Sequence, residues 1–424
     1  MAAALDKLQC LGDPQAASHL LRCCLGASKV VHLLRTASYA VCSEFAKRVQ
    51  TLLKSSWGTV IGTPLGEANW SLASLPVRLG GFGASDPAVL HPQAAVASFL
   101  AAASGRAGLP LAHLDSDLRA AVDALCLLLP EVANPLRDLW LSGSLTRILD
   151  DPAADSWTEQ KVWTAAVHET LARRFDREAS DRMERLRNLC AGANGGAWIT
   201  NLPLEHDGCT TFTADEWQVL CRFRLGLPLR SGTTCSGCGS PQDAFGDHAL
   251  SCPACGMYAR HNTLRDSLAA EFNRAGIPTK LEELLPDGSS RSDILLLEPS
   301  EILPEHIDVS AVHPLHHSAS PAEAAPGTAA AQREAIKLSS EGARECSRRH
   351  QKFTPVAAET TGAWGPAAQR CIRGLARKQS MRLGEELGPV AKRLWRRLSG
   401  AVAKGTARML LRGFAEVVVG GSAS

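Results

Sequence analysis

The sequence predicts a multidomain chain of the α+β class, and three observations indicate this. Apolar pairs such as Leu20-Leu21 and Leu52-Leu53 recur at helical spacing through much of residues 1–190. Residues 257–365 instead combine helical segments with short apolar runs of strand length, which is typical of a small mixed sheet covered by helices. Between these regions, the cysteine cluster that begins at Cys235 has the spacing of a small metal-binding module.

The bulk composition is that of a folded, water-exposed chain. With 424 residues, 45% of them hydrophobic and 21% charged, it can form two to three domains with sizeable cores. Its fourteen cysteines are irregularly spaced, which does not fit a secreted disulfide scaffold. The N-terminus lacks the apolar core of a signal peptide, and no apolar run reaches the roughly 18 residues of a membrane span. We therefore expect a reducing, intracellular setting, in which clustered Cys and His bind metal.

The net charge of +2 hides a strongly basic C-terminal stretch. Twelve Lys or Arg and only two Glu lie between Gln369 and Arg412. Such an excess favours contact with a polyanion, most simply the phosphate backbone of a nucleic acid. A solvated helical face is the alternative. The candidate phosphate contacts are Lys392, Arg393, Arg396 and Arg397.

The first half of the chain reads as a helical scaffold. Residues 1–60 are expected to be helical, a glycine-rich break follows at residues 75–83, and a further helix is expected over 92–103. Residues 116–190 are mostly helical, and Ala193-Asn194-Gly195-Gly196 is typical of a junction. The predicted segments are a helical region 1–115, a helical linker region 116–196, a pre-zinc helix and zinc module 197–256, an α/β unit 257–365, and a basic helical tail 366–424.

The α/β unit is predicted from alternating helix and strand signals. The expected order is helix, three strands, helix, strand. The helices are Arg260–Arg274, which stops at Gly276, and Ala329–His350; the strands are Lys280–Leu285, Asp293–Leu297, Ile307–Val312 and Phe353–Glu359.

The cysteine cluster has zinc-ligand spacing. Cys235 and Cys238 are separated by two residues, and His248 and Cys252 by three, so the two pairs can complete a tetrahedron. A thiolate-rich tetrahedral site favours zinc and leaves no open position, which makes the expected role structural. Cys255 could replace one of these ligands, and a set of buried free cysteines is the alternative interpretation.

Two aspartates at the starts of neighbouring strands form a candidate catalytic site. Asp293 and Asp308 can be brought side by side by a hairpin, and paired carboxylates bind magnesium, which hydrolysis of a phosphodiester requires. Lys337 on the following helix is the candidate that positions water or stabilises the transition state, since position 310, where a D-x-K motif has lysine, is serine. Glu283, or its neighbour Glu282, could add a carboxylate.

Each of these residues also has an ordinary structural interpretation. An aspartate at a strand start is often a turn cap, although a carboxylate inside an apolar strand, as at 308, is costly to bury unpaired. A helix lysine such as Lys337 is by default a surface residue. Arg260 and His261 could begin a helix or contact DNA, and a His beside the metal module could also be a zinc ligand.

Together these residues resemble a known family. The motifs are Gly246-Asp247-His248-Ala249-Leu250-Ser251-Cys252, Arg260-His261-Asn262, Arg291-Ser292-Asp293-Ile294-Leu295, Ile307-Asp308-Val309-Ser310-Ala311-Val312, Lys337, and Phe353-Thr354-Pro355 through Glu359-Thr360. In this order they resemble the C-terminal region of non-LTR retrotransposon reverse transcriptase proteins. That region joins a CCHC zinc module to a restriction-like endonuclease of the PD-(D/E)xK fold.

The resemblance implies magnesium-dependent nicking of target DNA, whose 3′ end then primes reverse transcription. It implies that Asp293 and Asp308 are the two acids and Lys337 the displaced lysine. It implies the CCHC ligands Cys235, Cys238, His248 and Cys252. The partners implied are DNA, with the element RNA as a further candidate, and an upstream polymerase region in a full-length parent protein. A nuclear location is implied as well, and no membrane.

The chain departs from the family pattern at two places. Ser292 stands where proline or alanine usually precedes the first aspartate, and Ser340 and Glu341 stand where a second helix lysine is often found. These departures keep an alternative open, a nucleic-acid-binding remnant with a decayed nuclease site.

Segments upstream of the zinc module add to the resemblance. Leu11–Gln15, Leu34–Thr36 and Leu75–Gly83 resemble the thumb and connector that follow a reverse transcriptase palm, and Trp198 and Arg222–Gly226 fit the stretch before the zinc module. The sequence contains no Phe/Tyr-x-Asp-Asp polymerase motif. We therefore do not expect this chain to be a reverse transcriptase by itself.

Overall fold

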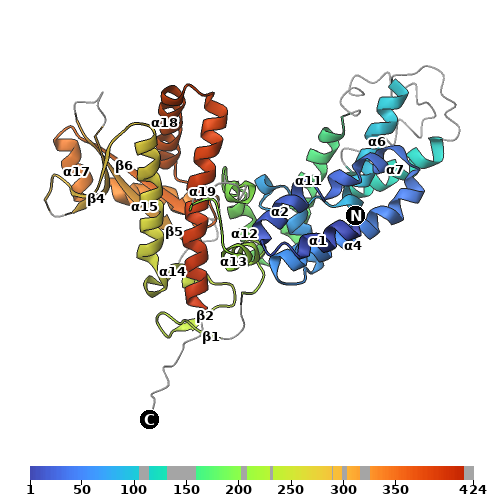
Figure 1. Ribbon diagram of the computed structural model, residues 1–424, viewed down its shortest axis with the longest axis horizontal. Helices are drawn as coiled ribbons and strands as arrows, with labels where there is room; N and C mark the ends of the chain where they lie inside the picture. Colours follow the sequence, from blue (N-terminus) through green and yellow to red (C-terminus); the bar gives the residue numbers. More distant parts are fainter. Residues whose placement is uncertain are drawn as a thin grey trace, which may run out of the picture. The chain divides into compact units, whose positions relative to one another are not determined.

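The computed structural model describes residues 1–104, 114–130, 159–201, 208–229, 233–288, 290–297, 303–315 and 325–414. It divides into two compact units, Met1–Ser180 and Asp181–Ser424 (Figure 1). The predicted α+β class is confirmed, because the described residues are mostly helical with a small sheet. The finer five-segment division stays a prediction. Within the described ranges, no helix is both long enough and apolar enough to cross a bilayer.

The first unit consists of helices. They are α1 Ala2–Gln9, α2 Pro14–Cys23, η1 Ala27–Lys29, α3 Val31–Thr36, α4 Tyr39–Ile61, α5 Glu67–Ser74, η2 Val77–Leu79, α6 Pro87–Ser104, α7 Leu114–Leu128 and α11 Gln160–Glu178. The helices expected in residues 1–60 and 92–103 are present. Part of the expected helical region 116–190 lies outside the described residues.

One buried carboxylate joins three helices of this unit. Asp86 caps the start of α6 by accepting the main-chain N–H of Ala88 at 2.9 Å. Its other oxygen accepts the indole N–H of Trp70 on α5 at 2.7 Å and the amide of Gln50 on α4 at 2.6 Å. Because burying an unpaired carboxylate is costly, these bonds fix the relative positions of the three helices.

The second unit contains the sheet. Its elements are α12 Asp181–Cys190, η4 Ala197–Thr200, α13 Ala214–Arg224, β1 Thr233–Thr234, β2 Pro241–Gln242, α14 Asp247–Ser251, η5 Pro253–Cys255, α15 Met257–Arg274, β3 Thr279–Leu284, β4 Arg291–Leu296, β5 Glu305–Val312, α16 Thr328–Leu338, α17 Glu341–Arg348, β6 Lys352–Glu359, α18 Pro366–Leu383 and α19 Leu387–Gly413. Each of the four predicted strands lies within two residues of its observed bounds.

The four-stranded sheet has the order β3-β4-β5-β6. The pairs β3–β4 and β4–β5 are antiparallel, and β6 runs parallel to β5 after the crossover through α16 and α17. The β4–β5 ladder ends where Ile294 pairs with Ile307. The parallel ladder continues along β5, where Asp308 pairs with Pro355. The two candidate aspartates therefore lie where the antiparallel ladder stops.

The helix predicted over residues 329–350 is two helices. α16 ends at Leu338, and Ser340 begins α17 by accepting the main-chain N–H of Ala343 at 3.3 Å. A serine that caps a helix in this way competes with continuation of the preceding helix. The single-helix prediction was wrong at this point, because the capping serine starts a second helix.

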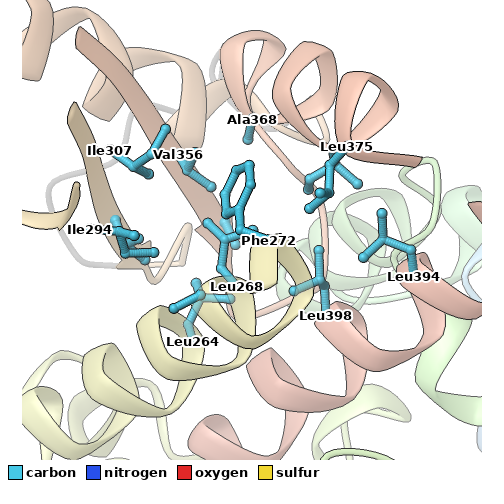
Figure 2. Close-up of a cluster of buried hydrophobic side chains, with 14 of the residues drawn as sticks. Leu264, Leu268, Phe272, Ile294, Ile307, Val356, Ala368, Leu375, Leu394 and Leu398 are labelled. Atoms are coloured by element: carbon cyan, nitrogen blue, oxygen red, sulfur yellow. The ribbon is translucent and has the colours of Figure 1, made fainter. Parts of the chain in front are cut away.

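The main core of the second unit lies between one face of the sheet and α15, α18 and α19. Figure 2 shows Phe272 of α15 surrounded by Val356 of β6 and by Ala368 and Leu375 of α18. Leu394 and Leu398 of α19 complete the same cluster. Burial of each large apolar side chain in this cluster contributes about 1.5–3 kcal/mol.

The expected basic tail is part of this core. In Figure 1 α19 runs alongside α15, and the apolar faces of α18 and α19 are buried. The sequence count of basic residues concealed this amphipathic pattern. The segment is therefore a layer of the domain and not a separate arm.

Candidate functional site

The two predicted aspartates meet at the point where β4 and β5 diverge. Asp293 lies one residue before the last β4–β5 pair, and its Oδ2 accepts the main-chain N–H of Val309 at 2.5 Å. Val309 directly follows Asp308 on β5. The Asp293 carboxylate thus replaces a main-chain carbonyl of the interrupted ladder, which satisfies a buried N–H group. This contact holds one acid against the main chain that carries the other.

Lys337 reaches the same place from α16. Its Nζ lies 2.9 Å from both carboxylate oxygens of Asp308. Asp308 is on the β5 face opposite the core residues Ile307 and Val309, and α16 covers that face. The structure therefore brings together Asp293, Asp308 and Lys337, three of the four residues predicted as catalytic.

Burial acts on the charge of Asp308. Its side chain is 12% exposed, and this burial raises the pKa of the carboxyl above its usual 3.8. The hydrogen bond and charge of Lys337 lower the pKa, while the negative charge of Asp293 raises it. Desolvation is the largest of these effects, so the site disfavours an unneutralised carboxylate.

His261 is the fourth member of this cluster. It lies on α15, and its Nε2 is 2.9 Å from Oδ1 of Asp293. The two Asp293 oxygens are therefore each bonded, one to His261 and one to the main chain. The sequence singled out His261 as a nucleic-acid contact or a zinc ligand, but its observed partner is a carboxylate of the strand site.

Glu283 does not join the aspartates. It is on β3, its register partner is Ser292, and its ionic neighbour is Lys280 at 4.0 Å. Within the described residues, no third carboxylate, Cys or His lies close enough to both aspartates to complete a three-ligand metal group. Glu282 instead pairs with Arg265 of α15. The expectation of a carboxylate from Glu283 is corrected, because its register partner is Ser292, so its side chain shares the sheet face of Ser292 and not that of the adjacent Asp293.

Two buried glutamates hold the helix that carries Lys337; Glu359 belongs to a motif of the resemblance, whereas no sequence signal identified Glu334. Glu359, at the end of β6, accepts the main-chain N–H groups of Ala329 and Ala330 in the first turn of α16. Glu334 of α16 accepts those of Ala367 and Ala368 in the first turn of α18, at 2.8 and 2.9 Å. Carboxylates are stabilised at helix N-termini by unpaired N–H groups and the helix dipole.

The predicted metal ligands converge in the structure. The Sγ atoms of Cys235, Cys238 and Cys252 and a ring nitrogen of His248 all lie within 4.8 Å of one another. Nε2 of His248 is 3.3 Å from Sγ of Cys238. Three sulfurs and one imidazole in this arrangement could hold a metal such as zinc, and the donor set fits a closed structural site.

Local turns prepare this cluster. Cys235 and Cys238 lie in a knuckle in which the Gly239 N–H donates to the Cys235 carbonyl at 2.8 Å, with Gly239 at φ +74°. Asp243 then accepts the N–H groups of Phe245 and His248, which orients the histidine. Glycine adopts this left-handed conformation without a steric cost, so Gly239 favours the turn.

Cys255 lies beside the cluster but is not one of the four converging ligands. Its Sγ is 3.3 Å from that of Cys235, and burial raises the pKa of the Cys255 thiol. The Cys238 thiol behaves in the opposite way, since the hydroxyl and N–H of Ser240 lower its pKa to about 6. The geometry decides the ligand set, since Cys238 lies among the four converging donors and Cys255 does not.

A buried ion-pair network connects the Cys/His module to the sheet. Asp247 of α14 receives two hydrogen bonds from Arg182 of α12, at 2.9 and 2.8 Å. His313, just after β5, lies 3.2 Å from Asp247 and 2.7 Å from the Thr360 hydroxyl that follows β6. Burial alone would raise the pKa of Asp247, but His313 and Arg182 lower it to about 2.

Arg260 is a structural residue of the same junction. It is 3% exposed, and it donates to the carbonyls of Leu250 in α14 and Ala311 in β5, at 3.1 and 2.9 Å. A guanidinium enclosed in this way cannot reach a phosphate. We therefore correct the prediction that Arg260 contacts nucleic acid.

The predicted basic contacts on α19 differ in their surroundings. Arg393 pairs with Glu385 at 2.6 Å, Arg396 donates to the Thr200 hydroxyl at 3.2 Å, and Arg397 lies 3.7 Å from Glu271. Lys392 is exposed. On α18, Arg370, Arg373 and Arg377 are exposed at spacings of three and four residues, which places them on one helix face. The sequence count did not distinguish these two helices.

No family model matches this sequence, and neither does any curated protein. We therefore base the functional argument on the side chains and their contacts.

Proposed function

We propose that this chain is a metal-dependent DNA endonuclease that nicks a target site. In this proposal residues 257–365 form a restriction-like core of the PD-(D/E)xK type, and the chain is the part of a non-LTR retrotransposon protein that follows the polymerase palm. One observation supports it above all others. Asp293, Asp308 and Lys337, which are far apart in sequence, meet where β4 and β5 diverge. Burying two carboxylates and an amine costs desolvation free energy, which a functional role for these groups would explain.

The residues present fit magnesium. Asp293 and Asp308 supply hard oxygen donors of the kind magnesium prefers, and a nearby divalent charge would offset the burial that raises the pKa of Asp308. These two carboxylates would hold the ion. When bound, magnesium would neutralise phosphate charge and acidify a water molecule.

The other side chains have roles that follow from their positions. Lys337 carries a positive charge next to Asp308 and can bind the scissile phosphate or orient the attacking water. His261 fixes the orientation of the Asp293 carboxylate from the opposite side. The main-chain bond from Val309 holds that carboxylate in register. The site is therefore preorganised by groups on α15, β5 and α16.

The basic helices and the Cys/His module suit a nucleic-acid substrate. The exposed arginines of α18 and Lys392 of α19 supply positive charge for backbone phosphates, and such contacts weaken steeply as salt rises. The Cys/His cluster has the donor set of a structural zinc site, and we assign zinc to it. DNA is the proposed partner, with element RNA as a further one, and the nucleus is the proposed location.

A second candidate function is nucleic-acid binding with a decayed nuclease. One observation favours it: both Asp293 oxygens and the Asp308 carboxylate already have protein partners, and position 310 holds serine. In that case the site would be a buried polar network with no metal.

A nicking assay on supercoiled plasmid with magnesium separates the two. We expect Asp308→Asn to reduce the nicking rate by about 10²–10³-fold and Lys337→Ala by about 10²-fold, because each removes charge stabilisation at the phosphate. DNA affinity, measured by fluorescence anisotropy, should change little.

The matched controls are Asp266→Asn and Lys280→Ala, which remove exposed charges on α15 and β3. Glu283→Gln should also nick at the wild-type rate. Binding without any nicking by the wild-type chain would favour the second candidate, and unchanged nicking by Asp308→Asn would refute the site.

A further inference from the structure

We infer that Arg333 is a second cationic group of the proposed catalytic site and binds a non-bridging oxygen of the scissile phosphodiester. This inference rests on the proposed function and extends it to a residue that no sequence motif singled out. It begins from the position of Arg333 on α16, four residues before Lys337. Residues four apart project from the same face of a helix, so both cations face β5.

The two cations reach two positions on the same face of β5. Lys337 contacts Asp308, and Nε of Arg333 lies 3.4 Å from the hydroxyl of Ser310. Alternate residues of a strand share a face and are about 7 Å apart. Asp308 and Ser310, taken as whole residues, are each less than 10% exposed. Lys337 therefore contacts Asp308, and Arg333 contacts Ser310, which is two residues further along β5.

The guanidinium of Arg333 has capacity left for an anion. Among the described residues, its one hydrogen-bond partner is Ser310, and it has no carboxylate partner. Neighbouring arginines differ: Arg344 and Arg348 of α17 both pair with Glu341. Arginine is always charged and presents five N–H groups, so a half-buried guanidinium with one long bond can still bind a phosphate through its terminal nitrogens.

The small side chain at position 310 makes this arrangement possible. A lysine there would extend its own amine into the space next to Asp308, whereas serine leaves room for a guanidinium that arrives from α16. The positive charge would thus come from the helix instead of the strand. Arg333 thus adds a second positive charge beside position 310, next to the one that Lys337 supplies at Asp308.

Arg333 would act by electrostatic stabilisation and would form no covalent bond with the substrate. In phosphodiester hydrolysis the bond from phosphorus to the attacking water oxygen forms while the bond to the leaving oxygen breaks. The water loses a proton and the leaving oxygen gains one, so atoms and charge balance. Negative charge grows on the non-bridging oxygens, and a fixed guanidinium stabilises it.

A charge transplant in the full chain tests this inference. We expect Arg333→Ala to slow magnesium-dependent plasmid nicking by about 10–100-fold, with less than about a threefold change in affinity for a labelled duplex. The double variant Ser310→Lys/Arg333→Ala should nick at least ten times faster than Arg333→Ala alone, because the strand then supplies the cation. The nicking rate of Arg333→Lys should lie between those of the wild type and Arg333→Ala. Arg344→Ala, which removes an exposed arginine of α17, is the control and should nick like the wild type.

The outcomes separate this inference from the proposed function. If Asp308→Asn abolishes nicking but Arg333→Ala does not alter it, the Arg333 role is refuted and the nuclease stands. If Asp308→Asn nicks normally, the nuclease site itself is refuted, and the Arg333 role with it.

A second readout avoids dependence on turnover. Calcium should strengthen duplex binding by the wild type, because a cation held by the two acids also attracts phosphate. Arg333→Ala should reduce this gain, and an unchanged gain in Arg333→Ala would overturn the inference even in a chain that does not nick. Thermal melting of each variant shows whether it folds.

Discussion

Asp308 is a carboxylate in surroundings that disfavour its charge. The nearest cation, Lys337, lowers the carboxyl pKa, yet burial outweighs it, and the pKa stays above the usual value. The neighbouring Asp293 adds repulsion. Such a pair of acids is stable only if a proton or a cation reduces the local negative charge. In the proposed function, a divalent ion bound by this pair would stabilise the folded state.

This gives a prediction for the dependence of stability on pH. Because the folded state raises the pKa of Asp308, the folded chain holds this proton more tightly than the unfolded chain does. The associated stability is present at low pH and is lost as the pH rises through the folded-state pKa, which lies above 3.8. In EDTA near pH 7, Asp308→Asn should therefore melt at a higher temperature than the wild type.

Melting curves over a range of pH check this expectation. The difference between Asp308→Asn and wild type should narrow as the pH falls toward the titration range of Asp308. Magnesium should then raise the melting temperature of the wild type only. A variant that melts below the wild type at neutral pH would contradict the expectation, and Asp266→Asn is the exposed control.

At the scale of elements, α16 is the helix on which the site depends. Its side chains Arg333 and Lys337 face β5, while Glu334, between them, faces the start of α18. Glu359 holds the first turn of α16 from the end of β6. One short helix is thus fixed at its beginning by the sheet and fixes the next helix in turn. These buried contacts therefore fix the helix that carries Arg333 and Lys337.

We expect Glu334→Ala to lower the free energy of unfolding by about 3 kcal/mol. The substitution removes a charged acceptor from the N–H groups of Ala367 and Ala368 and leaves these buried donors unsatisfied. Chemical denaturation followed by tryptophan fluorescence measures the change, because Trp364 lies just before α18 and is 2% exposed.

Glu345→Ala on α17 is the matched control for this variant. Glu345 pairs with Arg348 and Arg349, which are both exposed, and surface ion pairs contribute little. We expect a change below about 0.5 kcal/mol. An equal loss in the two variants would show that Glu334 is no more than a surface charge.

The sequence predicted the strands better than it predicted these caps. Apolar runs bounded by turn residues identify strands locally, and the candidate pair Asp293 and Asp308 followed from their places at strand starts. Glu334 has no sequence signal, and Glu359 was noted only as part of a motif; the fold alone shows that both accept N–H groups at helix N-termini. Arg333 likewise has no sequence signal, and only the fold places it beside Ser310 of β5. Arg260 was misjudged because a buried arginine and a surface arginine look alike in a sequence.

At the scale of the whole second unit, the Cys/His module is joined to the sheet through several buried contacts. The Arg182–Asp247–His313 network connects α12, α14 and the end of β5. The end of α19 also contacts the cysteine knuckle, where the Ser236 N–H donates to the Gly413 carbonyl at 3.3 Å. The position of the module is therefore coupled to the core and not set by a flexible linker.

We predict one zinc per chain, held by the four converging ligands. Cys238→Ser should lose the zinc, because a hydroxyl does not replace a thiolate ligand, and the module should unfold. Cys255→Ser should retain one zinc, since Cys255 is outside the converging set. Elemental analysis of the purified variants, with Cys371→Ser as a control, provides the measurement. Loss of zinc in Cys255→Ser alone would move the ligand assignment to that residue.

The late position of α19 in the sequence has a consequence for synthesis of the chain. Leu394 and Leu398 belong to the same core as Phe272 and Ile294, which are made a hundred or more residues earlier. Until α19 is synthesised, the apolar face of the sheet lacks one of the three helices that cover it. A chain that ended before α19 would thus expose apolar core residues and become a substrate for chaperones and proteases.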